Sequence, residues 1–216
     1  MAYVKKDVPI VVVKRLPRYY RHLTDLLNQG VTRISSKALS QRLGVTASQI
    51  RQDFNCFGGF GQQGYGYNVE HLRSEIADIL GINKGYKTIL MGAGNLGHAL
   101  ANHANFQKRG FTLIGVFDVR EEVIGTTIAG VKVYDIADLE SFMKTNKPEI
   151  AILALPKSSV REMAQKLCEL GIKGIWNFSY SDFDIPVDVP IENVHLSDSL
   201  MTLSYNITKK NEMSED

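Results

Sequence analysis

Three glycines at a fixed spacing, Gly92, Gly94 and Gly97, directly follow the apolar run of residues 88–91. In such a turn the first glycine permits a tight bend, the second lets a pyrophosphate approach the backbone, and the third lets a helix pack closely on the strand. The unpaired N–H groups at the start of that helix then hold the phosphates. The spacing therefore predicts a dinucleotide phosphate site. Its residues are Gly92, Ala93, Gly94, Asn95, Leu96 and Gly97.

A carboxylate occurs where such a site needs one. Asp118 ends the next apolar run, 21 residues after Gly97. A carboxylate at this position accepts hydrogen bonds from the adenosine ribose hydroxyls and repels a 2′-phosphate, which favours NAD over NADP. Arg120 weakens that preference and is included in the predicted site. Two alternatives remain. One is a doubly wound fold that has no dinucleotide site, and the other is a site for a CoA-type ligand.

The elements that must position these residues are strands and helices in alternation from residue 87 onward. We expect strands at 87–91, 112–118, 131–134, 149–155, 173–178 and 191–196, and helices at 95–107, 136–145 and 157–170. This alternation predicts an α/β fold, a doubly wound parallel sheet with helices on its faces. Ligands bind such sheets at the carboxyl ends of the strands. Further residues predicted to line the dinucleotide site are Ala154, Leu155, Pro156, Asn177 and Phe178. Their residue types would be equally ordinary at strand ends that bind nothing.

The N-terminal part differs in charge from the rest of the chain. Residues 1–60 hold 10 Lys and Arg against 3 Asp and Glu, whereas residues 81–216 hold 14 against 17. A basic segment attached to a mildly acidic remainder indicates a polyanionic partner for the first part only. A solvated basic face is the alternative explanation.

The same N-terminal part has the pattern of a helix-turn-helix. Apolar residues at helical spacing predict helices at 16–29, 35–44 and 46–57, the last opened by a capping box of Thr46 and Gln49. A tight turn at Gly44 joins the last two. Alternating aromatics among the glycines of residues 57–67 predict a hairpin, or wing, and a helix follows at 68–80.

Predicted DNA contacts fall on these elements. Arginine pairs with guanine and glutamine with adenine in the major groove, while basic side chains hold phosphates. Arg51 has an alternative partner in Asp53. The predicted DNA-binding residues are Ser48, Gln49, Arg51 and Gln52 on the third helix, Gln62 and Gln63 in the wing, and Arg15 and Arg18 near the start of the first helix.

Several function classes are disfavoured. No run of about 18 apolar residues could span a membrane. Cys56 and Cys168 form no CxxC pair, which suits a reducing, cytoplasmic setting without a metal site. His103 and His195 lack a recognisable acid–base companion, and too little sequence follows the sheet for a substrate compartment, so an enzyme is not expected. A small NAD-dependent oxidoreductase is the runner-up, and a thiol switch at Cys56 is a further alternative.

Longer segments carry a specific resemblance. The chain closely resembles the redox-sensing repressor Rex family at residues 45–53, 57–67, 92–97, 171–178 and 192–194. The resemblance implies a homodimer of a winged helix, residues 1–82, and a Rossmann domain, residues 83–196. It implies a repressor that holds palindromic, double-stranded operator DNA and releases it when NADH binds. NADH and NAD would be sensed ligands rather than substrates.

The resemblance also assigns the C-terminal segment. Residues 197–208 would form a helix that swaps across to the partner. The polar residues 209–216 themselves predict a frayed tail. From the pattern alone, its apolar stripe most simply describes a core helix of its own subunit. The stripe consists of Leu196, Leu200, Leu203 and Ile207.

The chain departs from the family pattern at two places. Gln62 and Gln63 replace a common Lys-Arg pair at the wing tip, so counterion release on DNA binding should be smaller. His103 and His195 stand where many members have a tyrosine and an aspartate near the nicotinamide. A histidine pair would add pH sensitivity. The alternative is that both histidines only pack at the dimer interface.

Overall fold

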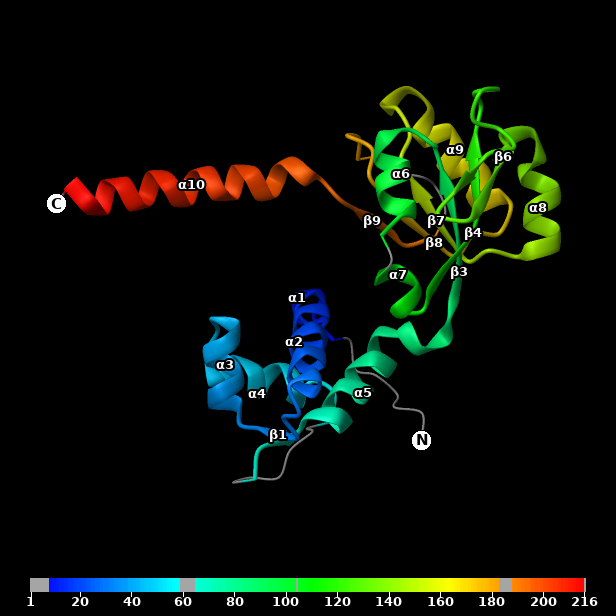
Figure 1. The fold of residues 1–216 in the computed structure, drawn as a ribbon. Coiled ribbons are helices and arrows are strands. Elements are labelled where there is room, and N and C mark those ends of the chain that lie inside the picture. The colour runs from blue at the N-terminus through cyan, green and yellow to red at the C-terminus, as the bar shows by residue number, and fades with distance from the viewer. Residues whose placement is uncertain (1–7, 59–64, 104, 183–187, 216) are drawn as a thin grey trace. The chain divides into compact units, whose positions relative to one another are not determined.

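The computed structural model describes residues 8–58, 65–103, 105–182 and 188–215. By its internal contacts the chain forms two units, residues 1–84 and residues 85–216. Figure 1 shows the helical first unit and the sheet of the second. Among the described residues, no helix is long and apolar enough to cross a membrane.

The first unit is built from helices whose ends follow local signals. The Ser35 hydroxyl accepts a hydrogen bond from the Ala38 N–H at the start of one helix, and Gly44, at a φ of 64°, ends it. Thr46 caps the next helix by accepting from the Gln49 N–H. These signals produce the predicted helix-turn-helix. The helices are α1 (Ile10–Val13), α2 (Leu16–Asn28), α3 (Ser36–Leu43), α4 (Ala47–Asn55) and α5 (Val69–Leu80).

Each of α2 to α5 buries one apolar face in a shared core. Phe54 on α4 packs edge to face against Tyr19 of α2 and against Tyr67, with ring centroids 5.3 and 5.2 Å apart. Fully buried leucines and isoleucines fill the remaining space. The Arg73 side chain of α5 donates to the Tyr20 hydroxyl and the Thr24 hydroxyl of α2, which ties these two helices together.

A short strand pair in this unit was not anticipated. β1 (Arg33–Ile34) pairs antiparallel with β2 (Tyr67–Asn68). Strands of two residues carry no period from which to predict them. Most of the predicted wing, residues 59–64 with Gln62 and Gln63 at its tip, lies outside the described residues, and the wing stays a prediction.

The second unit contains a seven-stranded sheet. Its order is β5-β6-β4-β3-β7-β8-β9, and all neighbours are parallel except β5 and β6. The chain enters at the centre, builds outward to one side and then returns to the other, which is the doubly wound order 3-2-1-4-5-6 with an added edge strand. The predicted fold class is therefore confirmed. The strands are β3 (Tyr86–Met91), β4 (Phe111–Asp118), β5 (Thr127–Ile128), β6 (Val131–Asp135), β7 (Ile150–Leu153), β8 (Gly174–Asn177) and β9 (Ile191–Asn193).

Side chains alternate across the sheet and bury both faces. Ile89 and Met91 of β3 join the core beneath two helices, whereas Leu90 between them joins the core on the opposite face. The helices of the unit are α6 (Asn95–Ala101), α7 (Asn105–Lys108), α8 (Leu139–Asn146), α9 (Lys157–Glu169) and α10 (Leu196–Glu215), with 3-10 turns at Ile82–Lys84 and Ile136–Asp138. Residues of α8 and α9 cover one face and those of α6 the other (Figure 1).

Two sequence predictions for this unit need correction, and one strand was missed. The helix expected at 95–107 is two helices, because α6 ends near Asn102, whose side chain donates to the His98 carbonyl oxygen. The tail expected to be frayed at 209–216 is helical to Glu215, since residues 209–215 contain no glycine or proline that would end α10. The edge strand β5 was not predicted.

Candidate nucleotide site and DNA-binding surface

The glycine turn lies between the end of β3 and the start of α6. Gly92 adopts a φ of 100°, and a Cβ atom there would lie 2.5 Å from the Ala154 carbonyl oxygen at the end of β7. A Cβ on Gly97 would lie 2.0 Å from the Gly92 carbonyl oxygen. Both positions require glycine because three backbone segments meet there. A Cβ on Gly94, the N-cap of α6, would have no atom within 4 Å. Gly94 therefore faces the open side of the turn.

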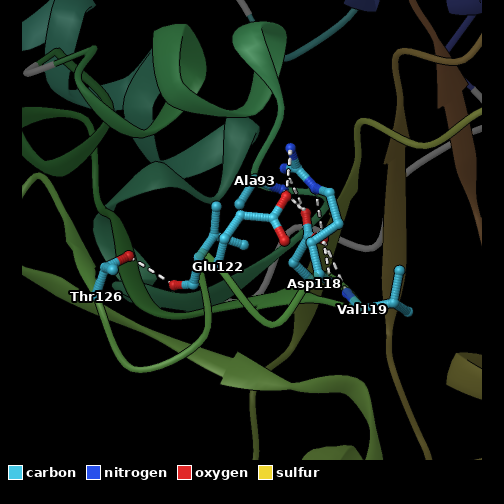
Figure 2. A network of polar contacts seen from close by, with 7 residues as sticks. Ala93, Asp118, Val119, Glu122 and Thr126 are labelled. Atoms are coloured by element: carbon cyan, nitrogen blue, oxygen red, sulfur yellow. Dashed lines mark hydrogen bonds and ion pairs between the residues drawn. The ribbon is translucent and has the colours of Figure 1, made fainter.

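Asp118, at the end of β4, is joined directly to this turn. Its Oδ2 accepts a hydrogen bond from the Ala93 N–H at 2.7 Å, and its Oδ1 accepts from the Val119 and Arg120 N–H groups at 2.9 and 3.0 Å. The Arg120 guanidinium adds two bonds, from Nε to Oδ1 at 3.0 Å and from Nη2 to Oδ2 at 3.1 Å. Figure 2 shows the carboxylate at the centre of this network. The fold thus brings together the two predicted parts of the site, the glycine turn and Asp118.

The electrostatics of Asp118 follow from these contacts. Burial alone would raise the pKa of its carboxyl group. The hydrogen bonds from the Arg120 side chain and from the backbone of Ala93 and Arg120 outweigh burial and lower the pKa to about 2. Asp118 is therefore fully ionised at neutral pH.

This pKa shift makes stability depend on pH. The folded pKa lies below the ordinary value of 3.8, so ionised Asp118 stabilises the fold above about pH 4, and the contribution is lost as the pH falls toward 2. It amounts to about 2 kcal/mol. The difference in free energy of unfolding between wild type and Asp118→Asn, measured by urea titration, should shrink by that amount between pH 5 and pH 2. A difference that is constant with pH would contradict this.

The remaining predicted wall residues divide into two groups. Ala154 and Leu155 adjoin the glycine turn, since the Leu155 Cδ2 atom would lie 3.4 Å from a Cβ on Gly92, and Pro156 caps α9 immediately after them. Asn177, at the end of β8, is fully buried. Phe178 follows it and packs on the Trp176 ring, with centroids 4.5 Å apart.

The Asn177 side chain is fully used inside the protein. Its Nδ2 donates to the Ser181 carbonyl oxygen and to Asn193 Oδ1, at 3.0 and 2.8 Å. Its Oδ1 accepts from the N–H and the hydroxyl of Ser179, at 2.9 and 2.7 Å. Two donors and two acceptor sites exhaust an amide. Asn177 thus shapes the segment after β8 and has no side-chain hydrogen bond left for a ligand.

The two histidines contact different residues. His103 is exposed, and its ring lies against the Phe106 ring with centroids 4.7 Å apart. His195 Nε2 lies 2.9 Å from Asp182 Oδ1. Each histidine therefore has a partner within its own chain. The expectation that they act together concerns an assembled dimer and stays a prediction.

A large hollow of about 840 Å³ lies on the α6 side of the sheet. It is separate from the glycine turn, because neither residues 92–97 nor Asp118 line it. Its lining is mostly apolar and includes Leu90, Leu113, Ile152, Phe106, Trp176 and Ile191.

One face of α4 is open to solvent. Ser48, Arg51, Gln52 and Asn55 are exposed at i, i+3, i+4 and i+7 spacing, whereas Ile50 and Phe54 on the other face are buried. Asn55 was missed as a candidate, although the spacing from Ser48 indicates it. The Arg51 Nη1 donates to the Ser36 hydroxyl at 3.1 Å. This open face, residues 48, 51, 52 and 55, is called the recognition face below.

Two residues predicted to contact DNA instead hold a buried carboxylate. Asp53, 1% exposed, accepts hydrogen bonds from Arg15 Nε and Nη2, both at 2.6 Å, from the Tyr19 hydroxyl, and from Gln49 Nε2 at 2.8 Å. Burial raises the pKa of Asp53, but these bonds outweigh it and the pKa lies below its ordinary value. The pairing of Asp53 with Arg51 was wrong, because Asp53 faces α2 rather than the recognition face.

Two other candidates are placed as follows. Arg18 is exposed on α2. Cys56 is exposed at the end of α4, and its Sγ donates to the Gln52 carbonyl oxygen. The described residues contain no group of three or more His, Cys, Asp or Glu side chains that could hold a metal ion.

Comparison with known proteins follows the same division of the chain. The family model "Putative DNA-binding protein N-terminus" matches residues 7–55, and "CoA binding domain" matches residues 83–180. The crystal structure of RSP in complex with beta-NAD+ and operator DNA has a TM-score of 0.89 and 51% identity, covering 98% of this chain and 97% of that one. The crystal structure of RSP in complex with beta-NADH has a TM-score of 0.89, 48% identity, and coverage of 98% and 99%.

Curated relatives agree over almost the whole length. The redox-sensing transcriptional repressor Rex of Caldicellulosiruptor saccharolyticus is 52% identical over 208 residues, covering 96% of this chain and 95% of the relative. The Rex protein of Thermoanaerobacter pseudethanolicus is 53% identical over 206 residues, covering 95% and 92%. Identity at this level over both units confirms the resemblance found in the sequence. The chain belongs to the Rex family of redox-sensing transcriptional repressors.

Proposed function

We propose that this protein represses transcription by binding palindromic operator DNA and that NADH binding releases it, so that it reports the NADH/NAD ratio. The observation that carries the proposal is the joining of Asp118 to the glycine turn, in one chain with a helix-turn-helix. NADH and NAD are ligands that it senses and does not turn over. We place its action in the cytoplasm.

The residues at the turn fit a dinucleotide. The turn is open at Gly94, where the pyrophosphate would approach the backbone of residues 92–97. The ionised carboxylate of Asp118 would accept the adenosine ribose hydroxyls. Residues 154–156 and Phe178 would form further walls, and Asn177 would support them from behind. His103 and His195 would lie toward the nicotinamide end.

For DNA, the recognition face supplies the base contacts. Ser48, Arg51, Gln52 and Asn55 share it, and arginine and amide side chains read guanine and adenine edges in the major groove. Arg18, with Gln62 and Gln63 of the wing, would contact phosphates. Arg15 and Gln49 would act indirectly, by holding α4 in place through Asp53.

We further propose a homodimer in which α10 of each copy packs on its partner. The apolar stripe of α10, residues 196, 200, 203 and 207, is more than half exposed. The apolar hollow beside α6 and α7 offers a surface of matching character. Both are features that a monomer would leave in water.

The dimer proposal predicts a specific loss on charge insertion. Leu203→Asp places a carboxylate in the stripe and should raise the dimer dissociation constant at least tenfold, measured by sedimentation equilibrium. Thr202→Asp adds the same charge on the opposite side of α10 and should leave it unchanged. Equal dimerisation of the two variants would contradict the proposed interface.

The function itself is tested by release. NADH, NAD, NADPH and CoA are titrated into the complex of the full chain with a palindromic operator, while DNA release and nicotinamide absorbance are followed together. Release by NADH without its oxidation supports the proposal. Oxidation of NADH would favour an oxidoreductase, and release by CoA alone a CoA-type site. If NADH had no effect and alkylation of Cys56 abolished the redox response, a thiol switch would replace it.

A further inference from the structure

We propose that Arg120 sets nucleotide selectivity at the adenosine end of the site, acting against NADH and in favour of nucleotides with a 2′-phosphate. The Arg120 guanidinium hydrogen-bonds the Asp118 carboxylate that the ribose hydroxyls would otherwise use. It also places a positive charge beside that carboxylate. The inference rests on the proposed nucleotide site.

The carboxylate of Asp118 is saturated in this structure. A carboxylate offers about four lone-pair sites, and Asp118 accepts five hydrogen bonds, three from backbone N–H groups and two from the Arg120 guanidinium. The backbone donors are fixed by the turn and by the strand end. Ribose hydroxyls can therefore bond to Asp118 only when the guanidinium withdraws.

Arg120 is built to withdraw at small cost. Its side chain is 45% exposed, whereas that of Asp118 is 7% exposed. A second carboxylate, Glu122 Oε1, lies 3.9 Å from Arg120 Nη1 and is well exposed. A released guanidinium therefore keeps both solvent and an anionic neighbour. Competition of this kind lowers the affinity for NADH and NAD alike by about threefold, the scale of a solvent-accessible ion pair.

For a nucleotide that carries a 2′-phosphate, Arg120 raises the affinity instead of lowering it. Asp118 alone would repel it, but the Asp118–Arg120 pair carries no net charge. Guanidinium groups bind phosphates with two parallel hydrogen bonds and prefer such geometry. An arriving 2′-phosphate would thus take Arg120 from Asp118 and give the released cation a partner. Without Arg120, the 2′-phosphate has no cation to bind and is still repelled by the Asp118 carboxylate.

The test is a pair of dissociation constants measured calorimetrically on the full chain without DNA. Arg120→Gln should bind NADH about threefold more tightly and NADPH at least about tenfold more weakly than wild type. Arg120→Lys, which keeps the charge and loses the fork, should fall between the two. Glu121→Gln is the matched control, because it removes a neighbouring charge that takes no part in the contacts of Asp118, Arg120 and Glu122, and it should leave the ratio of the two constants within twofold.

A purely structural role of Arg120 would not shift the dissociation constants of NADH and NADPH in opposite directions, because damage to the site would weaken the binding of both nucleotides. Shifts in the same direction, or an unchanged ratio in Arg120→Gln, would overturn the inference while leaving NADH sensing intact. A wild-type protein that failed to bind NADH at all would instead overturn the proposed function, and this inference with it.

Discussion

Replacing Gly94 with alanine should give a protein that folds normally and holds operator DNA but no longer lets go when NADH is added. A methyl group at Gly94 meets no protein atom within 4 Å, and its φ of −75° is one that alanine adopts freely. The same methyl group would occupy the space through which a pyrophosphate reaches the α6 backbone. We expect NADH affinity to fall about 100-fold, or about 2.8 kcal/mol.

The measurements are NADH affinity, the NADH concentration for half-release of DNA, and the thermal midpoint. Gly97→Ala is the informative contrast, because its methyl group would meet the Gly92 carbonyl oxygen at 2.0 Å and force the turn apart. Gly97→Ala should lose both stability and NADH binding, whereas Gly94→Ala should lose only NADH binding. Release of Gly94→Ala by NADH at wild-type concentrations would show that the ligand does not use this turn.

The substitution Asp53→Asn should damage the DNA-binding unit from inside. It leaves the Arg15 guanidinium without its carboxylate in a half-buried position and weakens the bonds from Tyr19 and Gln49. Losing one partner of such a pair costs about 2–3 kcal/mol of unfolding free energy. Since this network attaches α4 to α2, operator affinity should also fall about tenfold, while NADH binding by residues 85–216 should be unchanged.

Chemical unfolding, operator titration and NADH titration of one preparation separate these effects. Gln52→Ala, on the recognition face, is the control that should weaken operator binding without loss of stability. Because the pKa of Asp53 is lowered in the folded state, its stabilising contribution should disappear on acidification below the ordinary carboxyl range. A variant Asp53→Asn that is as stable as wild type and binds the operator equally well would refute the positioning role.

Local signals were sufficient for the elements that carry the site. The spacing of Gly92, Gly94 and Gly97 and the position of Asp118 follow from the chemistry of the turn, and the caps at Ser35 and Thr46 from helix-end chemistry. The glycine turn and the caps depend on residues a few positions apart, and Asp118 is marked by its place at the end of the next apolar strand. For that reason the sequence alone could specify them.

Long-range contacts could not be predicted in this way. Arg15 and Asp53 are 38 residues apart, and nothing in either segment marks them as partners. Arg15 and Gln49 therefore looked like DNA contacts when only their types were known. The saturation of Asp118 by Arg120 depends on the backbone direction just after β4, which a residue pattern does not contain.

The bond from the Ala93 N–H to Asp118 has a consequence for redox sensing. It sets the adenosine half of the pocket before any nucleotide arrives, and that half of the molecule is chemically the same in NADH and NAD. Free energy gained there is common to both ligands, so it cannot make the protein respond to one of them and not to the other. The distinction between the reduced and oxidised forms must therefore be made at the nicotinamide ring, where their charge differs, while the adenosine end supplies only the concentration range in which the protein responds.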